Sequence, residues 1–401
     1  MERTAKATPQ VAREHNERLV VATVYVHGRI SRADLARVTG LTRTTVSDVV
    51  ERLVASGLVA EAGRGPSTGG KAPILLEMPA RARLLIGVDL GDQVFTAAVV
   101  DLRGRIVRRA SAPSEGLSGE EAGRLALAVV DSALAHGDAP ILGVGVGAPG
   151  LIDTGTGTVI RSVTRDWRDL PLGQRIAEHT GLPVHVANDC QAAVFAEHVF
   201  GSAPAANLIA VKVGMGIGAG LILGGELFTG DGFGAGEIGH TIVHPDGEAC
   251  RCGRRGCLET VASLGAILRG IEARTGQPAS LDQALDAFAA GDPDAREVVL
   301  GAGRQLGYAL ASLVGALHVR RLVIAGTLAA FGPDWLDAIS AAMAERTLEA
   351  LAADVTVELG RVDDVVVLGA AALMMTRELG LRLQPLDATM SPVRGPRGAA
   401  R

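Results

Sequence analysis

Residues 84–110, LLIGVDLGDQVFTAAVVDLRGRIVRRA, decide the fold class of this chain. Three apolar runs rich in β-branched residues are separated by two short turns. This pattern predicts three consecutive antiparallel strands. Ser118 lies three residues before Glu121, so we expect a capping box to begin an amphipathic helix that runs to about His136.

Strands and helices alternate through the rest of the body. The run ILGVGVGAPG at residues 141–150 predicts a buried strand. The elements expected after it are a helix at 171–180, a strand at 184–187, a helix at 189–200 and strands near 207–213, 219–224 and 321–325. This alternation is typical of α/β layers.

The order of strand, glycine loop and strand that begins at residue 84 recurs from residue 207 onward. We therefore predict an α/β body of two similar lobes with a cleft between them, an actin-like, sugar-kinase-like (ribonuclease H-like) architecture. The first lobe would span residues 84–200 together with a C-terminal helix at about 366–378. The second lobe would span residues 201–365.

Residues 1–80 show the pattern of a separate, mostly α-helical module. Residues 14–27 predict a first helix, Ser31 and Gly40 are typical caps of a second, and Thr42 is a typical N-cap of a third. Two short helices joined by a glycine turn predict a helix-turn-helix. The third helix carries one apolar stripe at helical spacing, formed by Val46, Val49, Val50, Leu53 and Val54.

The third helix and the hairpin after it supply candidate DNA contacts. Residues 58–78, LVAEAGRGPSTGGKAPILLEM, predict two strands around a Gly-rich tip, the wing of a winged helix-turn-helix. Short polar and cationic side chains there suit base edges and phosphates. These candidates are Arg43, Thr44, Thr45, Ser47, Asp48, Arg64 and Lys71. The alternative is a three-helix packing or dimerisation module that contacts no DNA.

The charge of the chain is divided unevenly. The formal net charge is −5, but residues 1–83 carry 13 Lys and Arg against 8 Asp and Glu, a net of +5. The remaining residues carry 26 against 36, a net of −10. This asymmetry indicates that only the N-terminal module meets a polyanion such as double-stranded DNA.

Three of the four cysteines lie within eight residues of one another, and a histidine precedes them. The set is His240, Cys250, Cys252 and Cys257. One imidazole and three thiolates would fill all four positions of a tetrahedral Zn²⁺, so we predict one structural zinc ion per chain. The alternative is three reduced surface thiols and an unrelated histidine.

The chain has no apolar run near the roughly 20 residues that a membrane span needs. The N-terminal sequence MERTAKATPQ lacks the apolar core of a signal peptide. We therefore expect a cytoplasmic protein with no membrane partner. Residues 380–401 contain three prolines and scattered arginines, and we expect them to form a disordered tail.

Several segments resemble the ROK family (repressors, open reading frames and kinases), and the resemblance covers nearly the whole chain. SRADLARVTGLTRTTVSDVVERL resembles the DNA-binding module of the family's regulators, and GVDLG resembles the family's first phosphate loop. ANDCQAAVFAEH resembles its catalytic-aspartate segment. GEIGH with CRCGRRGCLET resembles its sugar-and-zinc signature, which is long and specific.

The resemblance implies a sugar-binding pocket. Its residues would be Gly150, Asn188, Asp189, Glu237, His240 and Glu259, with His240 shared between the sugar and the metal. From the residues alone, Asn188 and Asp189 could equally form a strand-end turn that caps the next helix.

The resemblance also bears on catalysis, because in the family's kinases the counterpart of Asp189 is the base. Those kinases carry Asp-x-Gly-Gly-Thr in the first phosphate loop, where this chain has Asp92 and Gln93 in the last two positions. Their second loop begins Gly-Thr-Gly, and here Met215 replaces the threonine. Residues 325–327 (Ala-Gly-Thr) also replace a run of glycines. We therefore expect no kinase activity, with Asp189 as a vestigial base.

Together these features predict a sugar-responsive DNA-binding transcriptional regulator, in this family usually a repressor. It would be a homodimer or homotetramer that binds a near-palindromic operator and responds to a sugar or sugar phosphate. The alternatives are an active ATP-dependent sugar kinase with an accessory N-terminal domain, and a bifunctional protein.

Overall fold

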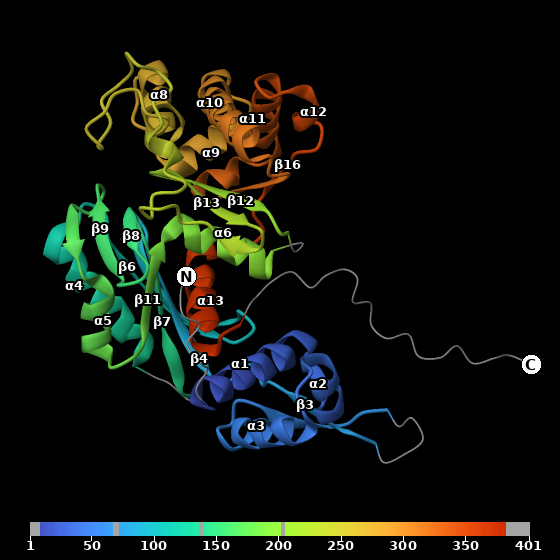
Figure 1. The fold of residues 1–401 in the computed structure, drawn as a ribbon. Coiled ribbons are helices and arrows are strands. Elements are labelled where there is room, and N and C mark those ends of the chain that lie inside the picture. Colours follow the sequence, from blue (N-terminus) through green and yellow to red (C-terminus); the bar gives the residue numbers. More distant parts are fainter. Residues whose placement is uncertain (1–8, 67–71, 136–138, 202–204, 382–401) are drawn as a thin grey trace, which may run out of the picture.

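The computed structural model describes residues 9–66, 72–135, 139–201 and 205–381. Figure 1 shows a small N-terminal module beside a body of two α/β lobes. This arrangement confirms the predicted fold class, a winged helix-turn-helix followed by a two-lobed, actin-like body. In the described part of the chain, no helix is both long and apolar enough to span a membrane.

The N-terminal module has three helices and one small antiparallel sheet of order β1-β3-β2. The helices are α1 (Pro9–His27), α2 (Arg32–Thr39) and α3 (Arg43–Ala55). The strands are β1 (Arg29–Ser31), β2 (Ala60–Arg64) and β3 (Ile74–Glu77). Strands β2 and β3 form the predicted wing, and the short strand β1 is an addition to the prediction.

The helix ends of this module are capped as predicted. The Ser31 hydroxyl accepts a hydrogen bond from the Asp34 backbone NH at 3.2 Å, and the Thr42 hydroxyl accepts one from the Thr45 NH at 3.1 Å. Gly40 ends α2 in the left-handed conformation, with φ of 71°. Local sequence therefore fixes the turn between the two helices.

The buried stripe of α3 is one residue shorter than predicted, because Val54 is 37% exposed whereas Val46, Val49, Val50 and Leu53 are buried. Successive helical residues turn by about 100°, which places Val54 about 80° around the helix from Val46. This position lies outside the stripe that packs on the rest of the module.

The first lobe is built on a five-stranded sheet of order β11-β7-β4-β5-β6. Its strands are β4 (Leu84–Leu90), β5 (Val94–Asp101), β6 (Ile106–Pro113), β7 (Ile141–Ala148) and β11 (Val184–Asn188). Strands β4, β5 and β6 pair antiparallel as predicted, and β7 and β11 extend the sheet in parallel. One face is covered by α4 (Gly119–Leu134) and α5 (Leu172–Thr180), and the other by α13 (Val365–Leu379).

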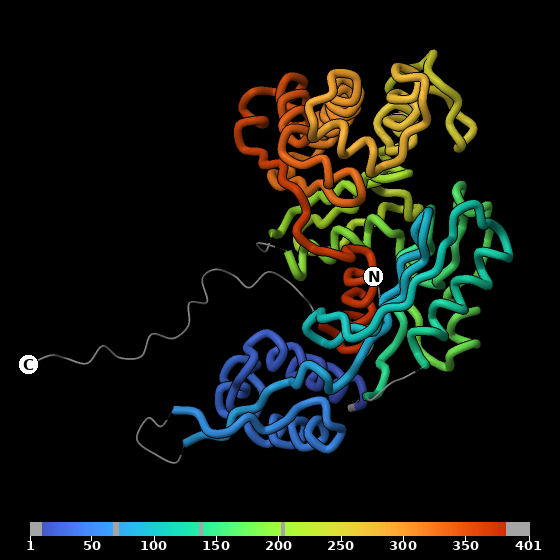
Figure 2. The backbone as a smooth tube through the Cα atoms, turned by 180° about the vertical axis from the view of Figure 1, so that it is seen from behind, coloured from blue at the N-terminus to red at the C-terminus, as the bar shows by residue number. Residues whose placement is uncertain are grey.

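Helix α13, the red helix in the view from behind in Figure 2, packs directly on this sheet. The reason is the glycines of β4 and β7. A Cβ atom at Gly145 would overlap the carbonyl oxygen of Ala370, and one at Gly87 would overlap that of Val367. The glycines in ILGVGVGA therefore allow α13 to pack closely on the sheet, and the segment also forms a buried strand.

The capping box predicted at Ser118 is wrong. Ser118 does stand at the N-cap of α4, but its side chain makes no cap hydrogen bond. A distant segment holds this turn instead. The Gly119 NH donates to the Arg165 carbonyl at 2.8 Å, and the Trp167 indole donates to the Gly119 carbonyl at 2.7 Å. The helix end expected near His136 lies outside the described residues.

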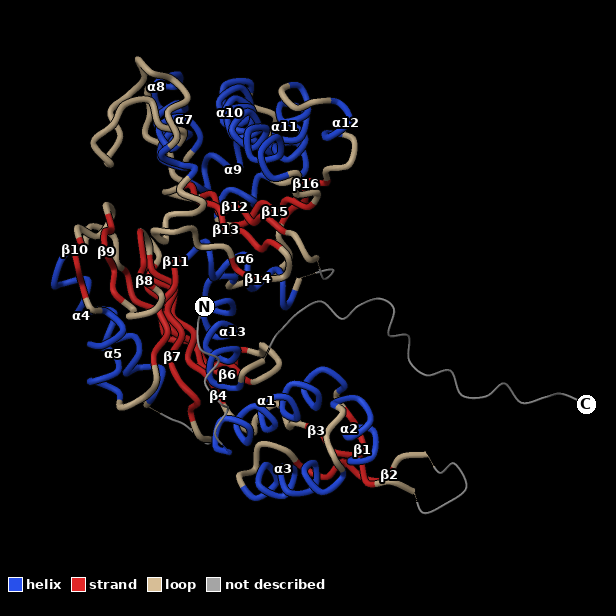
Figure 3. Tube along the Cα trace, in the orientation of Figure 1, coloured by secondary structure: helices blue, strands red, loops and turns tan. Residues whose placement is uncertain are grey.

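A small antiparallel sheet beside the first lobe, visible in Figure 3, was not predicted. Its strands are β8 (Leu151–Asp153), β9 (Thr158–Ser162) and β10 (Trp167–Leu170). Segments this short give too few alternating positions to be recognised in a sequence. The sheet directly follows Gly150, one of the residues predicted to form the sugar pocket.

The second lobe contains a sheet of order β14-β13-β12-β15-β16. Its strands are β12 (Leu208–Val213), β13 (Ile217–Leu223), β14 (Glu226–Leu227), β15 (Arg321–Ala325) and β16 (Thr356–Leu359). Its helices are η1 (Ile238–His240), α7 (Glu259–Ala262), α8 (Leu264–Thr275), α9 (Leu281–Ala289), α10 (Pro293–Leu317), η2 (Thr327–Phe331), α11 (Pro333–Glu345) and α12 (Glu349–Ala352). Helix α6 (Asp189–Phe200) packs between this sheet and α13, so the lobe boundary expected near residue 200 stays a prediction.

Candidate functional sites

The four predicted metal ligands come together in one cluster. The ligand atoms of His240, Cys250, Cys252 and Cys257 all lie within 4.8 Å of one another. The Cys252 and Cys257 sulfurs are 3.7 Å apart, and Cys250 Sγ is 3.7 Å from His240 Nδ1. A tetrahedral Zn²⁺ with Zn–S bonds of about 2.3 Å requires sulfurs about 3.8 Å apart, so the donor set fits a metal ion.

The loop that carries these ligands has little regular structure. Its backbone is held by two isolated bridges, Ile242 with Cys257 and Ala249 with Arg255, and by turn hydrogen bonds such as the one from the Cys250 NH to the Arg254 carbonyl at 2.7 Å. Gly256 has φ of 70°, and a Cβ there would overlap the His244 carbonyl oxygen, so only glycine fits this tight turn. A metal ion at the cluster would add a cross-link to this segment.

All the predicted sugar-site residues line one cavity of about 270 Å³ between the lobes. They are Gly150, Asn188, Asp189, Glu237, His240 and Glu259. The cavity is bordered on one side by the small β8–β10 sheet, through Leu151, Arg161 and Ser162. His240 thus lies in both the metal cluster and the cavity wall.

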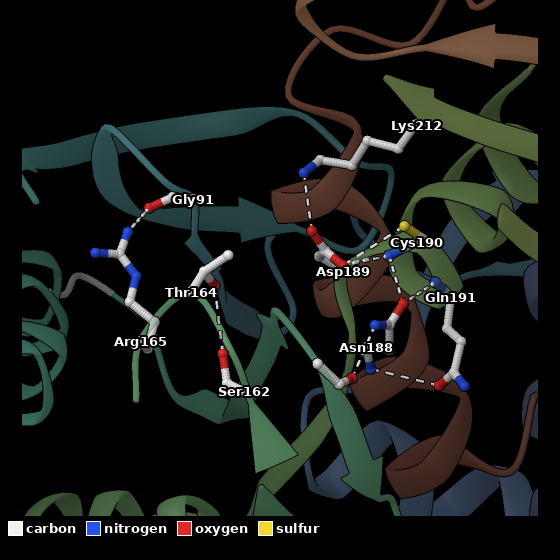
Figure 4. Close-up of polar contacts among 10 residues, drawn as sticks. Gly91, Ser162, Thr164, Arg165, Asn188, Asp189, Cys190, Gln191 and Lys212 are labelled. Carbon is white, nitrogen blue, oxygen red and sulfur yellow. Dashed lines mark hydrogen bonds and ion pairs between the residues drawn. The ribbon is translucent and has the colours of Figure 1, made fainter. Parts of the chain in front are cut away.

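Asn188 serves mainly as a cap. Its Oδ1 accepts from the backbone NH groups of Cys190 and Gln191 at 2.8 and 3.3 Å, and its Nδ2 donates to the Gly150 carbonyl at 2.9 Å (Figure 4). The strand-end turn that the residues alone allowed is therefore present. It also ties the Gly150 loop to the start of α6, which directs Asp189 into the cavity.

Asp189 is paired with a lysine that the sequence analysis missed. Lys212 Nζ lies 2.8 Å from Asp189 Oδ2, and both side chains are largely buried (Figure 4). Burial by itself would lower the pKa of Lys212, but the neighbouring Asp189 and Asp89 carboxylates raise it above its usual value. Lys212 is the one charged residue in strand LIAVKV, and this isolated charge was the available indication.

Buried carboxylates dominate the rest of the cavity. Burial, together with Asp189 and Glu259, raises the pKa of Glu237 to about 7. Glu259 is ion-paired with Arg251 at 3.2 Å. Closely spaced carboxyl groups in a confined space are well suited to accept hydrogen bonds from a polyhydroxylated ligand.

A second cavity of about 460 Å³ adjoins the first, and Asp92 and Lys212 line both. Its wall contains every residue for which we predicted a departure from the kinase pattern, namely Asp92, Gln93, Met215 and residues 325–327. Arg165, another residue that the sequence analysis missed, donates to the Gly91 carbonyl and to that of Ser114. This buried guanidinium fixes the loop that presents Asp92.

The candidate DNA contacts occupy the first turns of α3 and the end of β2. Arg43, Thr44, Asp48 and Arg64 are exposed, whereas Thr45 and Ser47 are half-buried. Thr45 Oγ1 lies 2.9 Å from Thr42 Oγ1, inside the cap, and this contact limits its reach. Lys71 lies outside the described residues.

Comparison with protein families defines the class of protein. Residues 85–377 match the model of the ROK family, and residues 15–66 match the model of the MarR family. The chain belongs to the ROK family.

Two regulators match nearly the full length of this chain. The chain is 29% identical to the xylose repressor of Caldicellulosiruptor bescii over 380 residues, which cover 90% of this chain and 95% of the relative. The crystal structure of a ROK family transcriptional regulator, a homologue of the Escherichia coli Mlc protein, superposes with a TM-score of 0.80 and 26% identity and covers 93% of this chain and 98% of that one.

A kinase of the family matches the body. The ROK family glucokinase of Streptomyces griseus, solved with glucose and AMPPNP, has a TM-score of 0.67 and 30% identity and covers 72% of this chain and 98% of that one. The body therefore has the kinase fold, and the full length corresponds to the regulators.

Proposed function

We propose that this protein is a sugar-responsive DNA-binding transcriptional repressor. The observation that carries the proposal is the fusion of a winged helix-turn-helix to a ROK body, which the xylose repressor matches over 95% of its length. It acts in the cytoplasm as a homodimer or homotetramer, and two-fold symmetry gives it a near-palindromic operator.

The proposed DNA surface is the start of α3 with the wing. Arg43, Thr44 and Asp48 are exposed on the first turns of α3, where side chains enter a major groove. Thr45 and Ser47 are half-buried and have short side chains, which suits contacts to the phosphates of the DNA backbone. Arg64 and Lys71 would extend the contact to a neighbouring phosphate or minor groove.

The proposed effector site is the cavity of Gly150, Asn188, Asp189, Glu237, His240 and Glu259. Its carboxylates offer acceptors for sugar hydroxyls, and the glucokinase of Streptomyces griseus was solved with glucose. One structural Zn²⁺ would be held by His240, Cys250, Cys252 and Cys257. With all four positions taken by protein ligands, the ion would shape the loop that carries Glu259 and take no part in chemistry.

A continuous hydrophobic cluster supports coupling between the effector site and the DNA-binding module. Helix α13 begins at the second cavity, where Val366 lines the wall, and its far end contributes Met375 and Leu379 to the hydrophobic cluster that also contains Val20 and Val24 of α1. The Tyr25 hydroxyl also donates to the Leu102 carbonyl at 2.9 Å. A change in cleft closure that moves α13 would therefore move α1, provided that the sugar binds one closure state better.

Kinase activity is not part of the proposal. A general base must accept a proton from its substrate, and Asp189 is engaged by Lys212 at 2.8 Å. Asp92 adds a negative charge where phosphate would bind, and Gln93 and Met215 replace hydroxyl donors. An active sugar kinase is the second candidate, favoured by the 30% identity of the body to a glucokinase.

The test is to incubate the full-length protein with fragmented DNA from its own genome at near-physiological salt and to sequence the retained fragments. We expect a few sites with an inverted repeat, and we expect Arg43→Ala to lower affinity for them at least tenfold. Arg124→Ala, an exposed arginine on α4, is the matched control. Diffuse, salt-sensitive binding that Arg43→Ala leaves unchanged would contradict the proposal.

A further inference from the structure

Charged side chains line the junction between the two cavities. Asp92 and Lys212 are the residues that line both cavities, and Asp189 lies in the first cavity within 2.8 Å of Lys212. A phosphate on the ligand hydroxyl beside Asp189 would project into this junction. The charges there decide whether a phosphorylated ligand is accepted.

The lysine at the junction, Lys212, is already ion-paired. Among the described residues that line the second cavity, Lys212 is the only lysine or arginine, whereas the carboxylates are Asp89, Asp92, Asp363 and Asp364. Lys212 is already neutralised by Asp189, and Asp364 is paired with Arg109. Asp89, Asp92 and Asp363 have no ion-pair partner among the described residues, so the surroundings are negative.

The arginines of the first cavity do not reach the wall of the second. Arg251 is paired with Glu259 at 3.2 Å, and Arg161 lies 3.7 Å from the exposed Asp166, with no hydrogen-bond partner at its buried Nη1. Neither lines the second cavity. Asp89 contributes less than Asp92, because burial raises the pKa of this carboxyl to about 7 and favours its uncharged form.

We propose that the effector cavity selects an uncharged sugar and excludes its phosphate monoester, with Asp92 and the Lys212–Asp189 ion pair as the residues that set this specificity. The inference rests on the proposed function, since it assumes that this cavity binds the effector. A doubly charged phosphate close to Asp92 and Asp363 in a partly buried site meets their repulsion. The cations beside this junction are already engaged, Lys212 by Asp189 and Arg165 by the carbonyls of Gly91 and Ser114. A neutral sugar donates hydrogen bonds from its hydroxyl groups to the carboxylates of the first cavity without that cost.

The test is isothermal titration calorimetry on the full-length protein with D-xylose, D-glucose, D-mannose and N-acetyl-D-glucosamine, and with the 6-phosphates of the three hexoses. We expect at least one neutral sugar to bind, and every 6-phosphate to bind at least tenfold more weakly than that sugar, a difference of about 1.4 kcal/mol. A 6-phosphate that binds as tightly as the best neutral sugar, or more tightly, would overturn the inference and leave the sugar-effector proposal standing. Absence of binding by every compound would contradict the sugar effector itself, and the inference with it.

Asp92→Asn tests the assigned residue. The variant removes one negative charge from the junction, so affinity for the 6-phosphate should rise at least threefold relative to the neutral sugar. Asp282→Asn removes an exposed carboxylate on α9, away from both cavities, and should leave this ratio unchanged. An unchanged ratio in Asp92→Asn would show that Asp92 does not set the specificity.

Discussion

The two adjoining cavities of this body differ in how well their lining residues match the pattern of the family's kinases. The first keeps every residue that resemblance to sugar-binding relatives implies, and the structure gathers them around one space. The second keeps its glycines but has Asp92, Gln93 and Met215 in its wall. The two share Lys212, whose ion pair with Asp189 lies at the junction. On the proposed function, binding and catalysis would be separable here, because recognition needs the hydrogen bonds of one cavity whereas phosphoryl transfer needs the charge balance of both.

The largest expected effect comes from breaking the metal cluster, which borders only the first cavity. Cys257→Ser should reduce zinc from one ion per chain toward none. Sugar affinity should fall at least 100-fold, because the loop that carries Glu259 loses its cross-link. Elemental analysis and calorimetry measure the two quantities. Cys190→Ala, which changes the fourth cysteine, should keep one zinc ion per chain. A zinc-free variant with unchanged sugar affinity would show that the first cavity does not depend on the metal.

A second, smaller effect concerns the second cavity and depends on pH. Burial raises the pKa of Asp89 to about 7, above its ordinary value in the unfolded chain. A raised carboxyl pKa means that stability is full at low pH and is lost as the pH rises toward 7. Asp89→Asn should therefore stabilise the protein increasingly between about pH 4 and pH 7 and by a constant amount above, at most about 4 kcal/mol.

Thermal unfolding of wild type and Asp89→Asn across this pH range measures the difference. Asp282→Asn is the control, because an exposed carboxylate should give a small difference with little dependence on pH. A stabilisation by Asp89→Asn that grows as the pH falls would contradict the assignment.

The smallest expected effect is a partial return of the second cavity to nucleotide binding. The triple variant Asp92→Gly, Gln93→Thr, Met215→Thr removes the added carboxylate and restores two hydroxyl donors. MgATP affinity should rise several-fold from an undetectable or weak level, measured by calorimetry with MgAMP as the control ligand. Sugar phosphorylation should still be absent, because Lys212 continues to hold Asp189. Turnover by the wild type, lost in Asp189→Asn, would instead establish the kinase alternative.

Features set by neighbouring residues of this chain could be predicted from its sequence, whereas features set by distant segments could not. Caps at Ser31 and Thr42 were confirmed because a cap hydrogen bond joins residues three apart. The capping box at Ser118 was wrong because residues 165–167 satisfy that turn from elsewhere. The metal cluster was found because four rare ligands lie within eighteen residues of chain. Val54 was wrongly assigned to the buried stripe of α3, because the sequence does not show whether another segment covers an apolar side chain at the edge of a stripe.

By itself, the sequence predicted the winged helix-turn-helix, the two-lobed α/β body with its main strands, and the four candidate metal ligands. These follow from spacing along a regular element or from a short specific motif. Resemblance to the ROK family implied the residues around the first cavity. Only the tertiary structure decided that Lys212 meets Asp189, that Arg165 holds the loop of Gly91, and that α13 reaches from the second cavity to α1. These contacts join segments from different strands and lobes, and the spacing of residues along a single chain carries no record of such distances.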